Sequence, residues 1–159
     1  MEKDVEEIVK IAKQILTQFG QHAPMLFVRG SKGKGMVTFK DFGPNHEDKV
    51  RQMANAGVDT AMKYKSGDLQ YLIFVTEAWM STAEMGKPYS QPSKDPKRKE
   101  MLVITTLDAV TKKQGLLMYQ MIRDKRGNLI ELNKFTEEWD TVESPLLPAF
   151  VAGYNLITR

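Results

Sequence analysis

The sequence predicts a single α+β domain, in which helices cover a mostly antiparallel sheet of five to six strands. Segments with an apolar residue at every third or fourth position indicate two amphipathic helices. Shorter apolar segments bounded by turn residues indicate strands. Short connections link most of these strands, and hairpin links make an antiparallel sheet the simplest arrangement. The expected order is α-β-β-α-β-β-β-β followed by a C-terminal tail.

Length and composition are those of an ordinary globular protein. A chain of 159 residues fits one domain, residues 1–159, and its 42% hydrophobic and 27% charged residues are not typical of disorder. The absence of cysteine excludes disulfides, thiolate metal sites and cysteine nucleophiles, and it suits a reducing cytoplasm. A net charge of +3 permits an acidic partner without requiring one.

Nothing in the sequence indicates a membrane or a secretory route. The first ten residues are acidic, whereas a secretory signal begins with basic residues and continues with an apolar run. The longest apolar runs, such as 72–75 and 149–152, are far shorter than the roughly 20 residues that span a bilayer. We therefore expect a soluble cytoplasmic protein without membrane contact.

The first expected helix precedes a hairpin. Asp4 is expected to cap the helix start and Gly20 its end, where a left-handed residue is favoured. Its apolar positions are Val5, Ile8, Ile11, Ala12, Ile15, Leu16 and Phe19. The strands 25–29 and 36–40 then flank Gly30–Gly35, which is expected to form a flexible hairpin tip.

A second helix is expected from His46 to about Lys65, with Asn45 as its cap. Three small residues lie on its apolar side, and we expect them to let the helix approach the sheet closely. They are Ala54, Gly57 and Ala61.

The strands of the second half are apolar on both sides, as central strands are when both faces of a sheet are covered. They are expected at 69–80, 100–107, 116–123 and 129–132, with a long loop at 81–99 and a tight turn at 124–128. Two helices would cover one face. The apolar tail from Phe135 onward or a second copy of the chain must cover the other, and this is the reason to expect a homodimer.

Glu77 is the most informative single residue, because alternation places it on the same face as Trp79 and other apolar residues. A carboxylate there needs a partner, and the return from the 81–99 loop would bring Arg98, Lys99 and Glu100 near it. The preferred interpretation is a structural ion pair with Arg98 or Lys99, for which Glu77→Gln lowers stability. The alternative is a carboxylate cluster of Glu77 and Glu100 that acts as an acid–base or metal site.

The basic residues suggest a possible contact with nucleic acid. Candidate contacts are Lys32, Lys34, Lys97, Arg98, Lys99, Lys125 and Arg126. The glycine-rich segment 30–35 is not a phosphate loop, because it leads into a strand rather than into a helix. Charged turns are usually just solvated, and no recognised nucleic-acid-binding motif is present.

The residues supply no reaction-specific motif. His22 and His46 are the only histidines, and their spacing to carboxylates does not indicate a zinc site. Asp41 and His46 could form an acid–base pair, but a role of this segment at the helix start is the better interpretation. The sequence therefore predicts no metal, no cofactor and no catalytic residue.

One segment resembles a known pattern. Glu77-Ala78-Trp79-Met80 followed by Gln-Pro-Ser-Lys-Asp-Pro-Lys-Arg-Lys-Glu at 91–100 resembles small uncharacterised prokaryotic and phage proteins, over residues 77 to about 104. The resemblance points to this strand–loop–strand unit and implies no activity for any residue. We expect a non-catalytic, self-associating interaction or accessory module. The alternatives are a nucleic-acid-binding module and a small enzyme with a carboxylate site around Glu77.

Overall fold

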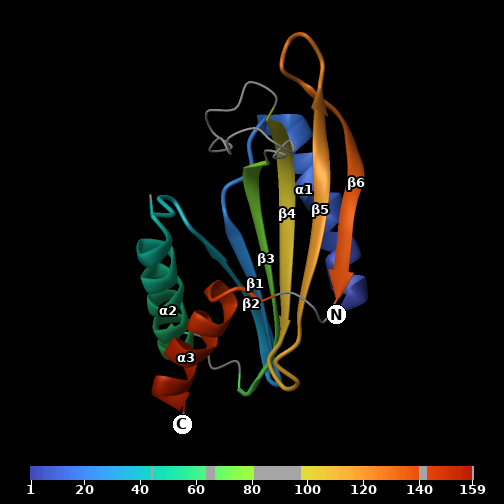
Figure 1. Ribbon diagram of the computed structural model, residues 1–159. Helices are drawn as coiled ribbons and strands as arrows, with labels where there is room; N and C mark the ends of the chain where they lie inside the picture. The colour runs from blue at the N-terminus through green and yellow to red at the C-terminus, as the bar shows by residue number, and fades with distance from the viewer. Residues whose placement is uncertain (44, 64–66, 81–97, 140–142, 159) are drawn as a thin grey trace, which may run out of the picture.

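The computed structural model describes residues 1–43, 45–63, 67–80, 98–139 and 143–158, and it confirms the predicted α+β class (Figure 1). Six antiparallel strands and three helices follow in the order α-β-β-α-β-β-β-β-α. Their bounds are α1 (Glu2–Phe19), β1 (Met25–Gly30), β2 (Gly33–Thr38), α2 (His46–Lys63), β3 (Leu69–Met80), β4 (Lys99–Asp108), β5 (Gln114–Arg123), β6 (Leu129–Trp139) and α3 (Leu146–Thr158). No helix within these ranges is both long and apolar enough to cross a membrane.

The sheet has the strand order β2-β1-β3-β4-β5-β6, with β1 between β2 and β3. Val75 in the middle of β3 is paired with Met25 of β1 on one side and with Ile104 of β4 on the other. Because all neighbours are antiparallel, the end of β3, the start of β4 and the β5–β6 turn (124–128) lie at the same end of the sheet. We call it the β5–β6 end.

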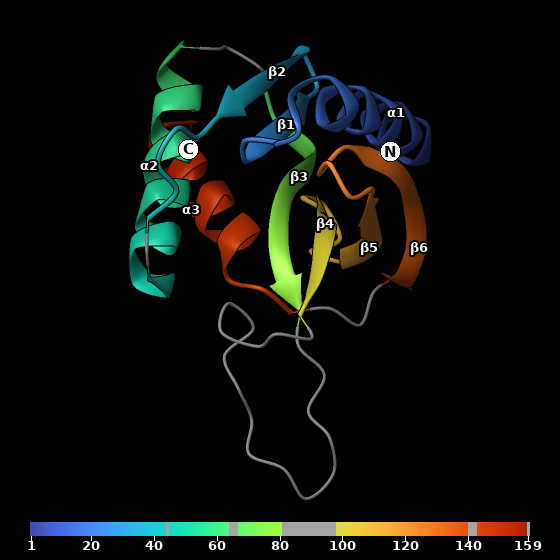
Figure 2. The same cartoon turned by 90° about the horizontal axis from the view of Figure 1, so that it is seen from above.

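Each face of the sheet has its own core. Alternate residues of β3 point to opposite faces: Ile73 and Val75 pack with α1, while Leu72 and Phe74 pack with α2 and α3. Figure 2 shows α1 on one side of the strands and the helix pair on the other. The expectation that the first two helices share a face is therefore wrong. Their apolar stripes predicted that each packs on the sheet but not on which face.

The expected tail is largely the helix α3, which packs on α2 and on the chain's own sheet. Periodicity did not indicate this helix, because its residues are apolar nearly all round. Pro148 lies in the first turn of α3, where a missing N–H costs little. The strand β6 is likewise longer than expected and continues through Phe135 to Trp139.

The small residues of α2 serve a different contact from the one expected. A Cβ on Gly57 would lie 2.1 Å from the carbonyl oxygen of Phe150 in α3. A Cβ on Gly153 would lie 2.0 Å from that of Ala54 in α2. The glycines therefore let the two helix backbones touch, and α2 approaches α3 rather than the sheet at this point.

Local signals were right in part. Gly20 ends α1 with φ of 76°, and Asn45 Oδ1 accepts the Asp48 N–H at 2.9 Å, as a cap does. Asp4, by contrast, lies inside α1 and accepts a hydrogen bond from the Tyr71 hydroxyl.

The flexible tip expected at 30–35 is a short turn, and Ser31 holds it through reciprocal hydrogen bonds with Asp68. Residues 81–97 of the expected loop lie outside the described residues.

The helix α1 covers its face of β4 and β5 more completely than α2 and α3 cover theirs. On the α1 side, Leu102, Ile104, Leu117 and Met121 are between 0 and 4% exposed. On the opposite side, Met101 is fully buried, but several other apolar side chains of β4, β5 and β6 stay partly exposed. They are Val103, Leu116, Met118, Ile122 and Phe135, and together they define what we call the open sheet face.

Candidate functional site

Glu77 lies on the α1 side of β3, near the β5–β6 end of the sheet. Its Oε1 accepts the backbone N–H of His22 at 3.3 Å. Burial raises the pKa of Glu77, and the neighbouring Glu100 adds to this, while the His22 N–H and Arg123 act in the opposite direction. Glu77 and Glu100 thus lie within electrostatic reach of each other.

Glu100 forms the main ion pair of this region, with Arg123 of β5. Arg123 Nε donates to Glu100 Oε2 at 2.8 Å, and a terminal nitrogen donates to Oε1 at 3.0 Å. The same guanidinium donates to the carbonyl oxygens of Gly20 and Gly127 at 2.7 and 2.9 Å. The hydrogen bond and the charge of Glu100, together with the charge of Glu77, raise the pKa of Arg123. Arg123 therefore ties the end of α1 to β4 and to the β5–β6 turn.

The predicted ion pair has different members. Among the described residues, Glu77 forms no ion pair with Arg98 or Lys99, and the carboxylate held by a cation is Glu100. Sequence reasoning missed Arg123 because its meeting with Glu100 depends on the register of β4 and β5. The only signal in the sequence was the position of the two residues at strand ends. Glu100 follows the expected loop 81–99, and Arg123 precedes the expected turn 124–128.

The chemistry available around Glu77 is limited. His22 is 5% exposed, burial lowers its pKa, and its Nδ1 lies 2.7 Å from the Ala23 carbonyl oxygen. Since a carbonyl can only accept, Nδ1 carries the proton and donates. Within the described ranges, no three His, Asp or Glu side chains gather as metal ligands would. The cluster can hold the end of α1 against β3, β4 and β5.

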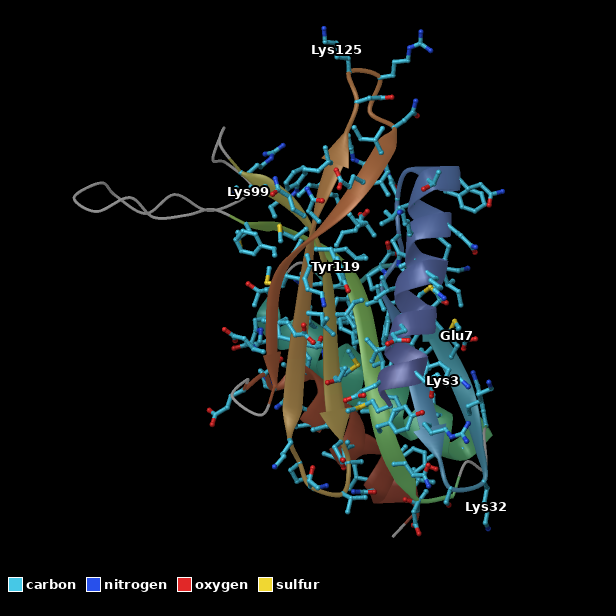
Figure 3. All side chains as sticks on the ribbon, turned by 90° about the vertical axis from the view of Figure 1, so that its right-hand side faces the viewer. Lys3, Glu7, Lys32, Lys99, Tyr119 and Lys125 are labelled. Carbon is cyan, nitrogen blue, oxygen red and sulfur yellow. The ribbon has the colours of Figure 1, made fainter. Side chains whose placement is uncertain are left out.

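The candidate basic residues separate into two groups at opposite ends of the sheet (Figure 3). Lys32 and Lys34 belong to the β1–β2 hairpin. Lys99 begins β4, Arg98 precedes it, and Lys125 and Arg126 stand in the β5–β6 turn at the other end. Lys97 lies outside the described residues. One surface thus cannot use all of these cations together.

Two partly exposed aromatic rings accompany the cations at the β5–β6 end. The Arg98 guanidinium lies 4.1 Å from the ring centroid of Trp79, which is 43% exposed. Lys99 Nζ lies 5.2 Å from that of Phe135, which is 44% exposed. Trp79 is on the α1 side, because it pairs with Glu100, whereas Lys99 and Phe135 are on the open sheet face. The sequence indicated an apolar tail from Phe135 onward and no contact of this residue with Lys99.

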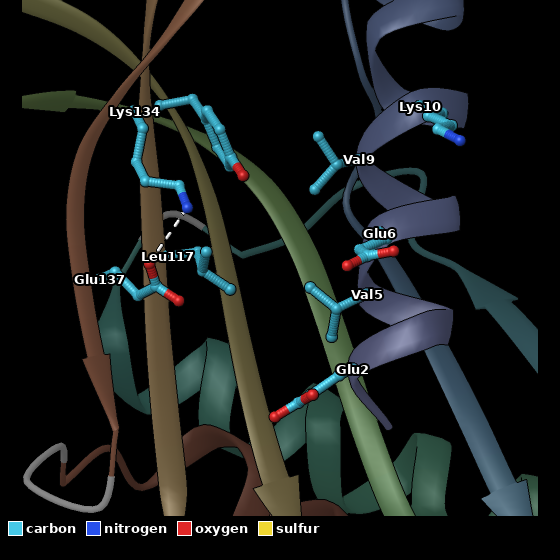
Figure 4. Close-up of a pocket in the computed structure, with 9 residues that line it drawn as sticks. Glu2, Val5, Glu6, Val9, Lys10, Leu117, Lys134 and Glu137 are labelled. Carbon is cyan, nitrogen blue, oxygen red and sulfur yellow. Dashed lines mark hydrogen bonds and ion pairs between the residues drawn. The ribbon is translucent and has the colours of Figure 1, made fainter.

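A groove of about 490 Å³ runs between α1 and the strands β5 and β6 (Figure 4). Val5, Val9 and Leu117 supply its apolar lining. Its charged side chains have both signs, and Lys134 donates to Glu137 at 3.0 Å along its β6 side. The groove therefore has no strong preference for one sign of ligand charge.

The fold and these surfaces define a small α+β protein. Comparison with protein families matches residues 1–154 to the family described as Bacteriophage lambda protein ea47. The chain therefore belongs to the lambda ea47 family, and the phage part of the sequence resemblance is confirmed. No curated protein and no solved structure matches the chain.

Proposed function

We propose that the chain is a non-catalytic interaction protein that acts as a homodimer, with the open sheet face as its interface. The supporting observation is the partial exposure of five apolar side chains on β4, β5 and β6, whose neighbours on the α1 side are buried. Full burial of a Leu, Met or Phe side chain is worth about 1.5–3 kcal/mol, so burying the remaining exposed part of several such side chains can contribute to association. Contiguous apolar patches on a protein surface commonly mark such interfaces.

The charges on the open sheet face favour a second copy as the partner. Lys99 begins β4 at one end of this face, and Glu138 is paired with Leu116 toward the other. Leu116 is in turn paired with Thr105, six residues along β4 from Lys99, which corresponds to about 20 Å. A two-fold axis in the interface between them would place each Lys99 near the partner's Glu138. Self-complementarity of this kind is what a symmetric dimer requires.

The surroundings of Glu77 and Glu100 support a structural role for both residues. Arg123 holds Glu100 with two hydrogen bonds, and the His22 backbone occupies one oxygen of Glu77. Both contacts fasten elements that are distant in the sequence, namely the end of α1 and the strands β3, β4 and β5.

The cytoplasm is the proposed place of action, in keeping with a chain that has no cysteine. Fractionation of cells that express the protein tests this location.

Sedimentation equilibrium tests the dimer. We expect the wild-type chain to sediment with twice the mass of the 18.1 kDa chain and Met118→Lys to sediment as a monomer. Leu156→Lys is the matched control, because Leu156 is 77% exposed on α3, away from the open sheet face. Far-UV circular dichroism confirms that both variants stay folded. A wild-type monomer at high concentration, or equal effects of the two variants, would contradict the proposal.

A further inference from the structure

The α1 side of the β5–β6 end carries an exposed indole beside a guanidinium. Trp79 occupies the second-to-last position of β3, and Arg98 lies against its ring rather than deep in the protein. Aromatic side chains are usually buried, because each one removes a large apolar area from water. An exposed aromatic ring accompanied by arginine is the combination on which proteins stack unpaired bases.

A continuous set of contacts connects this ring with the β5–β6 turn. Trp79 is directly opposite Glu100 in the β3–β4 register, and Glu100 is bound by Arg123. Arg123 in turn donates to the carbonyl oxygen of Gly127 in the turn. The exposed Lys125 and Arg126 stand in that turn, and Lys125 marks the projecting tip of the hairpin (Figure 3). The indole and the cations therefore belong to one surface.

The carboxylates of this surface are largely compensated. Arg123 matches the charge of Glu100, and the Asp124 carboxylate accepts the backbone N–H groups of Arg126 and Asn128 within the turn. In the part of the chain that the structure describes, neither Lys125 nor Arg126 has an ion-pair partner. The side chains that project from the turn thus present positive charge to solvent.

We propose that this surface binds single-stranded nucleic acid, with a base stacked on Trp79 and with Arg98, Lys125 and Arg126 in contact with phosphates. Single strands fit better than duplexes, because bases in a duplex are stacked on one another and offer no free face to an indole. RNA and DNA share the bases and phosphates that this surface would contact, so both are tested. The site lies on the opposite side of the sheet from the proposed dimer interface and does not depend on it.

Fluorescence titration tests the site. Trp139→Phe leaves Trp79 as the only tryptophan, and single-stranded DNA or RNA of about 12 nucleotides should quench its emission. On the wild-type chain, the anisotropy of a labelled oligonucleotide gives the affinity over a range of salt concentrations. We expect Trp79→Leu to weaken binding about ten-fold. Replacement of Lys125 and Arg126 by Gln should reduce the slope of log K against log salt by about 1.4.

Replacement of Lys32 and Lys34 by Gln is the matched control, since it removes the same charge from the opposite end of the sheet. The control should leave affinity and slope nearly unchanged. Thermal melting verifies that each variant is folded. The proposal is overturned if no oligonucleotide binds at low salt, if a duplex of equal length binds as tightly as the single strand, or if the two double variants lose affinity equally. A protein that dimerises but fails these tests would leave the proposed homodimer intact.

Discussion

At the scale of single residues, Arg123 connects several elements through the hydrogen bonds of one side chain. Its guanidinium donates to Glu100 and to two backbone carbonyl groups on separate elements. Hydrogen bonds to charged groups contribute about 1.5–3 kcal/mol, and both side chains of the pair are more than three-quarters buried. We expect Arg123→Gln to lower the free energy of unfolding by about 2 kcal/mol, measured by urea denaturation.

The pair of Lys134 and Glu137 is the control, because its side chains are 54 and 41% exposed. Exposed ion pairs contribute little, so Lys134→Gln should leave the free energy of unfolding nearly unchanged. If both variants lost the same stability, the connection that Arg123 makes between α1, β4 and the turn would not matter for folding.

Glu77 gives a prediction about pH. Burial raises its pKa in the folded protein, so the folded state binds more protons than the unfolded state above the ordinary glutamate range, near 4.5. The contribution of Glu77 to stability therefore falls as the pH rises from the ordinary glutamate pKa toward the raised pKa of the folded state. Glu77→Gln keeps an oxygen for the His22 N–H and removes the buried charge. We expect this variant to be more stable than the wild type at pH 7, with a smaller difference at pH 4.

Denaturation of both proteins at the two pH values measures the effect. A Gln variant that is less stable than the wild type at pH 7 would show that the carboxylate charge is stabilising in place. That was the expectation from sequence, which assumed an ion pair with Arg98 or Lys99. Alternation along β3 correctly placed Glu77 on an apolar face, but the identity of its neighbours depends on the register and on the end of α1.

At the scale of elements, the contact between α2 and α3 depends on two glycines. Gly57→Ala would put a methyl group 2.1 Å from the Phe150 carbonyl oxygen, and backbone cannot yield as a flexible side chain can. In an exposed helix, Gly→Ala adds about 1 kcal/mol of stability. Here we expect the opposite sign, a loss of about 3 kcal/mol, because the helices must move apart. The thermal midpoint and urea denaturation both measure this change.

Gly35→Ala is the matched control, since nothing lies within 4 Å of a Cβ at this position in β2 and its backbone needs no positive φ. It should alter stability by less than about 0.5 kcal/mol. A stabilising effect of Gly57→Ala would mean that the two helices are farther apart than the structure places them.

The elements also show where sequence patterns fail. The 3.6-residue period identified α1 and α2, because each has an apolar and a polar side. Apolar runs bounded by turn residues identified the central strands. The helix α3 has no polar side, since α2 and the sheet enclose much of it, and periodicity therefore could not identify it. The aromatic–cation pair of Lys99 and Phe135 joins residues on different strands, and no local pattern could predict it.

At the scale of the whole molecule, two cores share one sheet. The strand β3 supplies Leu72 and Phe74 to the core under α2 and α3, and Ile73 and Val75 to the core under α1. Neither core can lose its packing without changing a strand that supports the other. This arrangement favours one cooperative unit, and the prediction of a single domain over residues 1–159 depends on it.

Native-state hydrogen exchange can test this cooperativity. Gly57→Ala strains the core under α2 and α3, while Leu16→Ala removes a fully buried side chain from the other core, at a cost of about 3 kcal/mol. If the molecule unfolds as one unit, each variant should accelerate exchange of the slowest amides in β3, β4 and β5 by the same factor as its measured loss of global stability. If Gly57→Ala instead accelerated only amides of α2 and α3, that helix pair would be a separate unit, attached to a sheet that α1 can stabilise alone.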